Sequence, residues 1–293
     1  MALPAFGLVL MATLSACAVG ASTQGTDRTD APDATVAPTE PEHIEFDPAA
    51  FDDSSAVIDN PWLVMLPGTQ WIYDGFLETP EETLPHTIEF TVTDLTKEIQ
   101  GVSTAVAFIV DVTDGEIVEK EIAFYAQNVD GDVWYFGEHP VEYDKSEVVA
   151  APTWIAGYDG ALPGVKMWAD PKVGMPSYFQ GYAESVDWTD YGTIDEMGVE
   201  TCTDAECFED TLVIAESSLG EEDIFQLKHY AEGIGEVSVG WRGEPEEKEG
   251  LQLESVTQLS PEALAAIRAE ALALEAHAYE VSADVYGQTA PSS

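Results

Sequence analysis

Apolar and polar residues alternate along most of the chain, from about residue 46 to residue 258. This period of two is typical of β-strands with one buried face, and its clearest runs are 88–93, 106–112, 122–126 and 133–136. Asp-Gly pairs at 114–115 and 130–131 separate these runs and favour tight hairpins, because glycine accepts a positive φ. The same pattern predicts further strands at 69–77, 178–186, 193–200, 209–216, 223–231, 235–241 and 251–258.

The short turns between successive strands predict the fold class. Strands that follow one another this closely form an antiparallel meander, and their exposed edges favour closure into a barrel or a sandwich. We therefore expect a mainly β domain over residues 46–258. Residues 140–176 are rich in Gly, Pro and Trp, and we expect them to form a long crossover loop.

The period changes near the C-terminus. Ser260 is a suitable N-cap, Pro261 suits a first turn, and Glu262 is favourable at the positive end of a helix. Apolar residues then recur at steps of three and four, at Leu264, Ile267, Ala271, Leu274, Ala278, Val281 and Val285. The pattern predicts one C-terminal α-helix within residues 259–286, packed on the sheet, and a disordered tail at 287–293.

The chain is strongly acidic. Its 293 residues include 56 Asp and Glu against 10 Lys and Arg, which gives a formal net charge of −46. Because such a charge repels phosphate backbones, we expect no nucleic-acid partner. The acids are spread along the chain, as is typical of a solvated surface in salty surroundings, and capture of cations is the alternative.

The N-terminus predicts export. Residues 1–16 carry no charge, and the apolar run 6–12 is too short to span a membrane but suits a signal peptide. The sequence Leu-Ser-Ala-Cys ending at Cys17 resembles the bacterial lipoprotein box, although no Lys or Arg precedes the apolar run. We expect acylation of Cys17, including palmitate, and a flexible tether over residues 17–45. The acyl chains would hold the protein on the extracytoplasmic side of a lipid bilayer, and an ordinary secretory signal is the alternative.

Two cysteines remain after Cys17. Cys202 and Cys207 lie close in sequence, and outside the cytoplasm such a pair predicts a disulfide. A zinc site is the alternative, but two ligands with no histidine nearby do not complete one.

Two acidic loops are candidate metal sites. Asp130 and Asp132, with Asn128, resemble half of a calcium loop, and Asp187 and Asp190 belong to a second acidic loop. A full calcium loop also needs Gly at its sixth and Glu at its twelfth position, so a hairpin explains the first loop better. We therefore expect no cofactor, with Ca²⁺ as the alternative.

Catalytic motifs are absent from the sequence. There is no Gly-x-Ser-x-Gly elbow, no phosphate-binding glycine loop and no His-x-His or His-Glu-x-x-His spacing. His139 and His229 are the two histidines that could enter a pocket, and Glu138 beside His139 could take part in acid–base chemistry. Tryptophan and tyrosine are dense between residues 134 and 191, as in a barrel core or a binding cleft.

Several segments resemble a family of uncharacterised exported bacterial proteins. They are IDNPWL (58–63), LPGTQWIY (66–73), DGDVWYFGE (130–138), WIAGYDGA (154–161) and YAEGIG (230–235). The resemblance implies a secreted or lipid-anchored β-rich domain and supplies no activity. The resemblance also implies that five residues in or beside these segments belong to one shared feature, structural or functional. They are Glu138, Trp154, Asp159, Lys228 and Tyr230.

These patterns favour a binding module for a small molecule, a glycan or a cation, with its cleft edged by residues 137–163. The expected ligand-binding residues are Trp134, Glu138, His139, Tyr143, Trp154, Asp159, Lys228, His229 and Tyr230. The alternatives are an envelope hydrolase that uses carboxylates, with or without a divalent metal, and a structural envelope protein. Convergence of Glu138, His139, Asp159 and His229 would favour chemistry, and their scattering would favour binding or scaffolding.

Overall fold

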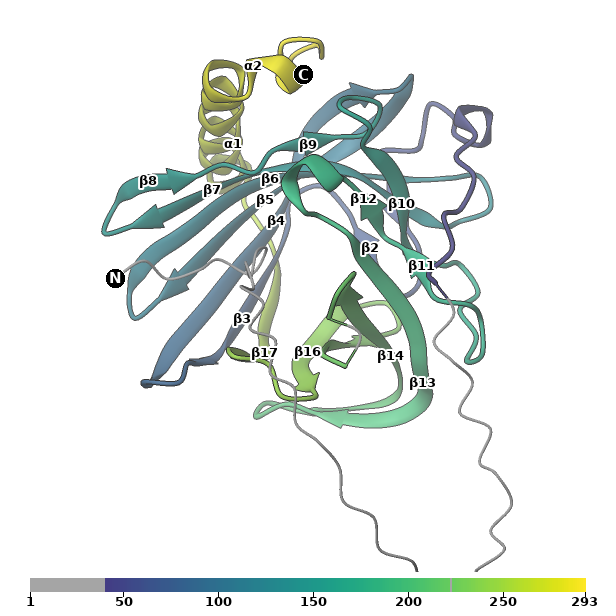
Figure 1. Cartoon of the computed structure of the whole chain (residues 1–293), viewed down its shortest axis with the longest axis vertical. Helices are drawn as coiled ribbons and strands as arrows, with labels where there is room; N and C mark the ends of the chain where they lie inside the picture. Colours follow the sequence, from purple (N-terminus) through teal and green to yellow (C-terminus); the bar gives the residue numbers. More distant parts are fainter. Residues whose placement is uncertain (1–39, 222) are drawn as a thin grey trace, which may run out of the picture.

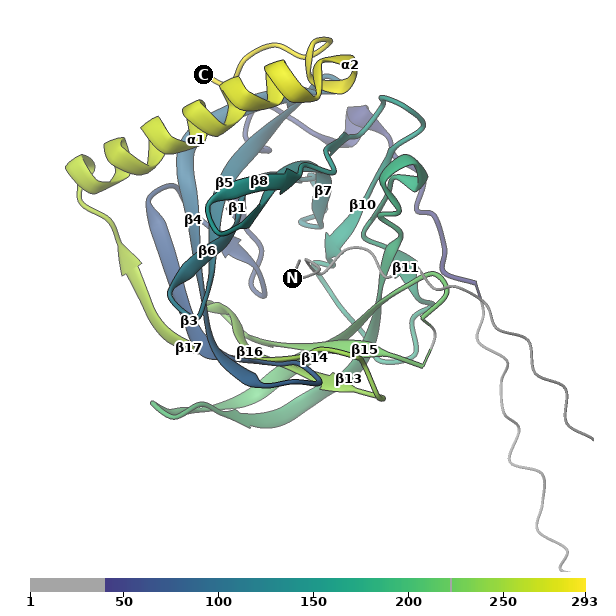
Figure 2. The same ribbon diagram turned by 60° about the vertical axis from the view of Figure 1, so that its left-hand side comes forward.

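A fifteen-stranded antiparallel sheet curls into a nearly closed barrel (Figures 1 and 2). The structure is a computed structural model that describes residues 40–221 and 223–293, so the expected signal peptide and most of the tether lie outside the described residues. The mainly β prediction is confirmed. The first half of the sheet contains β3 (Thr69–Glu78), β4 (Thr83–Ile99), β5 (Val102–Thr113), β6 (Glu116–Gln127) and β7 (Val133–Asp144). The second half contains β13 (Asp190–Cys202), β14 (Cys207–Ser218), β15 (Phe225–Ala231), β16 (Gly235–Arg242) and β17 (Lys248–Gln258).

One short stretch of chain, residues 178–182, joins the two edges of the sheet and closes it into a barrel. β17 pairs with β3, so the last strand of the sequence meets the first long one. At the far side, β10 (Leu162–Met167) pairs with β7, and β12 (Gly181–Tyr182) pairs with β10. β11 (Tyr178–Phe179) pairs with β13, and only Gln180 separates it from β12. Residues 178–182 therefore pair with both ends of the sheet and close the barrel.

The prediction of a long crossover loop at 140–176 is wrong. Its first residues continue β7, and β8 (Glu147–Ala150), β9 (Trp154–Ile155) and β10 follow within it. These strands are short, so their hydrogen bonds with β7 stabilise them where their own alternation is weak. Gly164 in β10 is required by close packing, because a Cβ there would lie 2.4 Å from the backbone nitrogen of Gly181. The strand predicted at 178–186 is likewise divided into β11, β12 and a 3-10 turn, Glu184–Val186.

The predicted C-terminal helix is confirmed as α1 (Pro261–Val281), which lies across the outer face of the sheet (yellow in Figure 2). The backbone nitrogen of Ala263 donates to Ser260 Oγ at 3.2 Å, as expected of the N-cap. The middle of the predicted stripe, from Ala271 to Ala278, is buried, whereas Val281 is exposed because the helix ends there. A short helix, α2 (Ala283–Tyr286), then buries Val285. Neither helix of the described residues is long and apolar enough to cross a membrane.

The expectation of a disordered tail at 287–293 is also wrong. The backbone of Ser293 forms two hydrogen bonds with the backbone of Thr96 in β4, at 2.9 and 3.0 Å. Lys97, whose side chain is fully buried, donates to the carbonyl oxygen of Ala290 at 2.7 Å. The tail is ordered because it supplies acceptors that the sheet and Lys97 would otherwise lack.

The two faces of the sheet differ in chemistry. Aromatic side chains such as Phe124 and Phe136 point outward, where α2 and the segment before β1 (Ile58–Asp59) cover them. The remaining short elements are β2 (Val64–Met65), which pairs with β1, and a 3-10 turn at Pro48–Ala50. Because side chains alternate, the positions between the outward aromatics point into the barrel, and many of them are charged.

Candidate functional site

Four carboxylic acids gather on the inward face of three neighbouring strands. They are Asp111 on β5, Glu119 and Glu121 on β6, and Glu138 on β7, and we call them the acidic wall. A fifth acid, Glu142 on β7, lies opposite Glu119 at the edge of this group. Asp111 lies directly opposite Glu119, and Glu121 and Glu138 lie on the same face further along the sheet. All four side chains are half-buried, so solvent or a ligand can reach them.

A second group of charges lies across the interior, and we call it the paired wall. Glu216 on β14 accepts from Lys166 at 2.8 Å and lies 3.2 Å from the Nζ atom of Lys228. Gln180, the residue that closes the barrel, also donates to Glu216 at 2.7 Å. Burial opposes ionisation of Glu216, but the two lysines outweigh burial and lower its pKa to about 2. The negative charge of Glu216 is therefore balanced by Lys166 and Lys228.

The carboxyl groups of the acidic wall, in contrast, have no such lysine partners among the described residues. Within the described part of the chain, none of its four carboxyl groups forms an ion pair. Burial, followed by repulsion from neighbouring acids, raises the pKa of Asp111 and of Glu121 to about 7. The same causes raise the pKa of Glu119 and of Glu138 well above the usual range for Glu. Burial and mutual repulsion therefore oppose the ionisation of these four groups.

Aromatic side chains border the acidic wall. The Tyr135 hydroxyl donates to Glu138 and lies 3.3 Å from Glu121 Oε1, so it stands between the two carboxyl groups. Its ring stacks on Tyr125 with the centroids 4.7 Å apart, and the edge of Trp154 approaches it at 5.3 Å. Trp154 is 1% exposed, and its Nε1 has no hydrogen-bond partner among the described residues.

His86 on β4 connects the acidic wall with β17. Its Nε2 lies 3.1 Å from Glu249 Oε1 and its Nδ1 lies 2.9 Å from Thr113 Oγ1. Burial opposes protonation of this ring, but Glu249 and Asp111 outweigh burial and raise the pKa of His86. Both ring nitrogens are thus engaged, and His86 serves as a fixed neighbour of Asp111.

The structure brings five of the predicted residues to the interior. Glu138, Trp154, Lys228 and Tyr230 point inward, and so does Asp190, which was a candidate metal ligand. Asp190 accepts a hydrogen bond from Ser218, and burial raises its pKa. The residues that the sequence pattern missed are Asp111, Glu119, Glu121, Lys166 and Glu216, which alternation alone assigns to a solvated face.

The other predicted ligand-binding residues lie away from the interior, which corrects the expectation of a single cleft. Trp134 packs on the outside against Phe46 and Phe51. Tyr143 points outward near the end of β7, and Asp159 is exposed in the turn before β10. These three side chains cannot contact a ligand that is bound inside the barrel.

Both candidate histidines also lie on the outer face. His139 lies beneath α1, 2.6 Å from Thr153 Oγ1 and 3.4 Å from His277, and burial lowers its pKa to about 3. His229 lies 2.9 Å from Thr201 Oγ1 on the outer side of β15. Glu138, His139, Asp159 and His229 are therefore scattered, and they form no acid–base constellation.

The candidate calcium loop is a hairpin turn. Asn128 Oδ1 accepts from the backbone nitrogens of Asp130 and Asp132, and Asp132 Oδ1 accepts from the backbone of Ala169 at 2.8 Å. Asp187 lies in an exposed left-handed turn. No group of three or more His, Cys, Asp or Glu in residues 40–221 and 223–293 is arranged to hold a metal ion.

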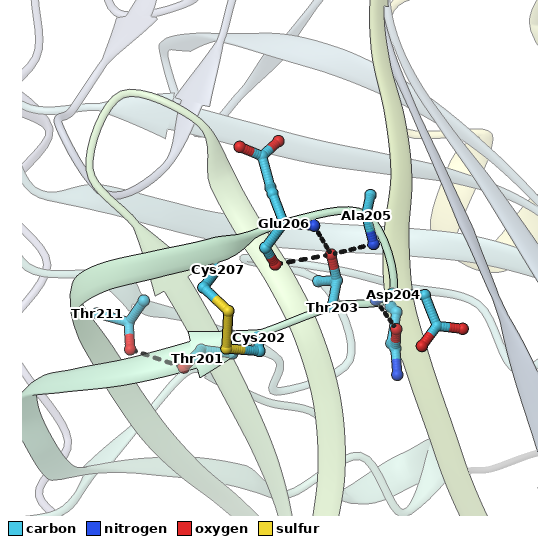
Figure 3. Close-up of a disulfide and its surroundings, with 9 residues drawn as sticks. Thr201, Cys202, Thr203, Asp204, Ala205, Glu206, Cys207 and Thr211 are labelled. Atoms are coloured by element: carbon cyan, nitrogen blue, oxygen red, sulfur yellow. Dashed lines mark hydrogen bonds between the residues drawn. A yellow bond between two sulfur atoms is a disulfide. The ribbon is translucent and has the colours of Figure 1, made fainter.

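The predicted disulfide is present (Figure 3). Cys202 ends β13 and Cys207 begins β14, and the bond closes the hairpin between the two strands. Within the turn, Thr203 Oγ1 accepts from the backbone nitrogens of Ala205 and Glu206 at 3.3 and 3.2 Å. The disulfide fixes the end of this hairpin, away from the acidic wall.

Fold and site together define a nearly closed antiparallel barrel with a charged interior. No family model and no curated protein matches the chain. One similar solved structure is a candidate lipoprotein from Parabacteroides distasonis, at 12% identity and a TM-score of 0.34, covering 70% of this chain and 100% of that one. Another is a candidate exported protein with a YmcC-like fold from Bacteroides fragilis, at 11% identity and a TM-score of 0.33, covering 67% of this chain and 98% of that one.

Proposed function

We propose that this protein is an exported, lipid-anchored binding module that holds a small ligand inside the barrel, against the acidic wall. The observation that carries the proposal is the contrast between the two walls. Glu216 has two lysine partners, whereas four carboxyl groups across from it have no ion pair in the described chain. Unpaired acids in a desolvated place are costly to the fold, and such groups cluster at functional sites.

The scattering of Glu138, His139, Asp159 and His229 favours binding over catalysis. Adjacent residues of one strand point to opposite faces, so Glu138 and His139 cannot serve the same ligand. His86, which does neighbour the acidic wall, is held at both ring nitrogens by Thr113 and Glu249. The interior thus offers charge and aromatic surface rather than a mobile proton carrier.

Two features of the sequence support an extracytoplasmic address. Residues 14–17 carry the lipoprotein-box resemblance that ends in Cys17. The disulfide between Cys202 and Cys207 is of the kind that persists in oxidising compartments outside the cytoplasm.

Calorimetric titration tests the binding proposal. Full-length protein in a neutral detergent is titrated separately with putrescine, calcium chloride, maltose and citrate, at constant ionic strength. A double variant, Glu121→Gln with Glu138→Gln, removes charge from the acidic wall. Glu116→Gln, at an exposed position on the same hairpin, is the matched control.

We expect at least one compound to bind saturably to the wild type and to the control, and not to the double variant. The proposal fails if none of the four compounds binds, or if binding is unchanged in the double variant. Turnover of any of them would support the carboxylate hydrolase instead.

A further inference from the structure

Two histidines lie against each other where α1 packs on β7. His139 comes from the strand and His277 from the helix, and Nε2 of His139 lies 3.4 Å from Nδ1 of His277. His139 is fully buried and His277 is half-buried. A neutral imidazole has one donor and one acceptor nitrogen, so this contact accepts one proton between the two facing nitrogens and excludes a second.

Hydrogen bonds connect His139 with the end of α1. Its Nδ1 lies 2.6 Å from Thr153 Oγ1, and Thr153 Oγ1 lies 2.8 Å from Ser282 Oγ. Ser282 stands between α1 and α2, and the ring of Tyr286 in α2 lies 5.7 Å from that of His139. His139 therefore joins the barrel to both helices, residues 261–286, which we call the C-terminal helical unit.

No carboxylate in the described chain offsets a positive charge on His139. Burial, and then His277, lower the pKa of His139 to about 3. The charged groups that join α1 to the sheet are already paired with one another: Lys97 with Glu275 and Lys120 with Glu270, each at 2.8 Å, and Asp94 with Arg268. The other acids on the neighbouring elements are exposed to solvent: Glu147 of β8, Glu280 of α1 and Asp284 of α2.

Acid should act on the barrel and on this contact in opposite directions. Burial raises the pKa of Asp111 and of Glu121 to about 7, so their protonation below that pH favours the folded barrel. The pKa of His139 is lowered, so its contribution is present above the ordinary value of 6.5 and is lost as the pH falls below it. Between about pH 6.5 and pH 4.5 the barrel is therefore stabilised while the attachment of the helices is weakened.

We propose that the contact between His139 and His277 is an acid-sensitive latch, and that mild acidification releases the C-terminal helical unit from a barrel that stays folded. Histidine suits such a latch because its charge changes between about pH 5 and pH 8. Release would uncover apolar side chains on the outer face of β6, such as Phe124, which packs against Tyr286. The latch is independent of any ligand inside the barrel.

Hydrogen–deuterium exchange at pH 7.5 and pH 5.0 tests the latch. Full-length protein in a neutral detergent is labelled for times adjusted to the intrinsic exchange rate at each pH, and peptides from residues 261–286 are compared with peptides from β5 and β6. His139→Gln removes the titratable group, and His139→Asn removes it with a side chain that can still hydrogen-bond Thr153. The matched control is His43→Gln, at an exposed histidine that stacks on Phe179.

We expect protection of residues 261–286 in the wild type and in the control to fall by up to about thirtyfold from pH 7.5 to pH 5.0, because a released His139 regains its ordinary pKa of 6.5. Protection of β5 and β6 should not fall. In His139→Gln and His139→Asn, protection of residues 261–286 should be the same at both pH values.

Three outcomes would overturn the proposal. Equal protection of residues 261–286 at both pH values in the wild type would show that no latch opens. An equal loss of protection in β5 and β6 would show that acid unfolds the whole domain. An undiminished pH dependence in both His139 variants would assign the release to another group.

Discussion

Replacing Glu121 by Gln should stabilise the protein in the absence of ligand. Burial and the neighbouring Asp111 raise the pKa of Glu121 from its ordinary value of 4.5 to about 7. Between these values the folded protein binds a proton that the unfolded chain does not, so stability falls as the pH rises through this window. Above the folded pKa the carboxyl group is ionised in both states, and the full destabilisation is present.

The size of the effect follows from the difference in pKa. At about 1.4 kcal/mol per pKa unit, a change from 4.5 to about 7 corresponds to an upper limit of about 3 kcal/mol. Water at the half-buried side chain and the weakened contact with Tyr135 reduce this value. We expect Glu121→Gln to add about 1 to 2 kcal/mol to the free energy of unfolding at pH 8, and almost nothing at pH 4.5.

Urea unfolding at the two pH values measures this difference. The midpoint and the slope of each transition are compared for wild type, Glu121→Gln and the exposed control Glu116→Gln. Only Glu121→Gln should gain stability, and only at the higher pH. A loss of stability at pH 8, or an equal gain at both pH values, would refute the assignment of Glu121 to an uncompensated acidic wall.

Three further predictions concern other parts of the chain. Lys97→Met should lower the free energy of unfolding, measured in urea, by about 3 kcal/mol, because it leaves the buried Glu275 without its cation. The double variant Lys97→Met with Glu275→Leu should recover most of this loss. An unchanged free energy of unfolding in the single variant would contradict the prediction. Cys17→Ala should move the protein from the membrane fraction to the soluble fraction, and continued membrane association would contradict lipid anchoring. Added sodium chloride should raise the melting temperature because it screens the net charge of −46, and a constant melting temperature would show that the acids are already compensated.

The alternation of side chains was sufficient to predict the long strands, since β3 to β7 and β13 to β17 each present two distinct faces. It was insufficient for β9 to β12, which are two to six residues long and are stabilised by their neighbours in the sheet. A Cβ at Gly164 would collide with the neighbouring backbone, and one at Gly181 would collide with the indole rings of Trp154 and Trp188. Glycine at these positions removes the apolar signal that alternation requires. Short strands that close a barrel are specified by their partners rather than by their own pattern.

The candidate site was predicted only in part for a related reason. Alternation separates the two faces of a strand but does not say which face lies inside. Here α1 and the N-terminal segment cover the apolar face, so the polar face encloses the interior, and Asp111 and Glu121 resemble solvated acids in the sequence. The same alternation could have shown that Glu138 and His139, or Lys228 and His229, belong to opposite faces.

The lysines of the paired wall influence the protonation state of the acidic wall near neutral pH, but in the described chain they do not form ion pairs with it. Burial raises the pKa of Asp111 and of Glu121 to about 7. His86 and then Lys228 oppose this rise at Asp111, and the Tyr135 hydroxyl and then Lys228 oppose it at Glu121, so these acids are near half-ionisation around pH 7. Neither lysine can leave Glu216 to neutralise them without exposing a buried carboxylate to the full cost of desolvation. The two lysines therefore stay with Glu216, and lowering the pH should protonate the acidic wall and weaken the binding of any cationic ligand there.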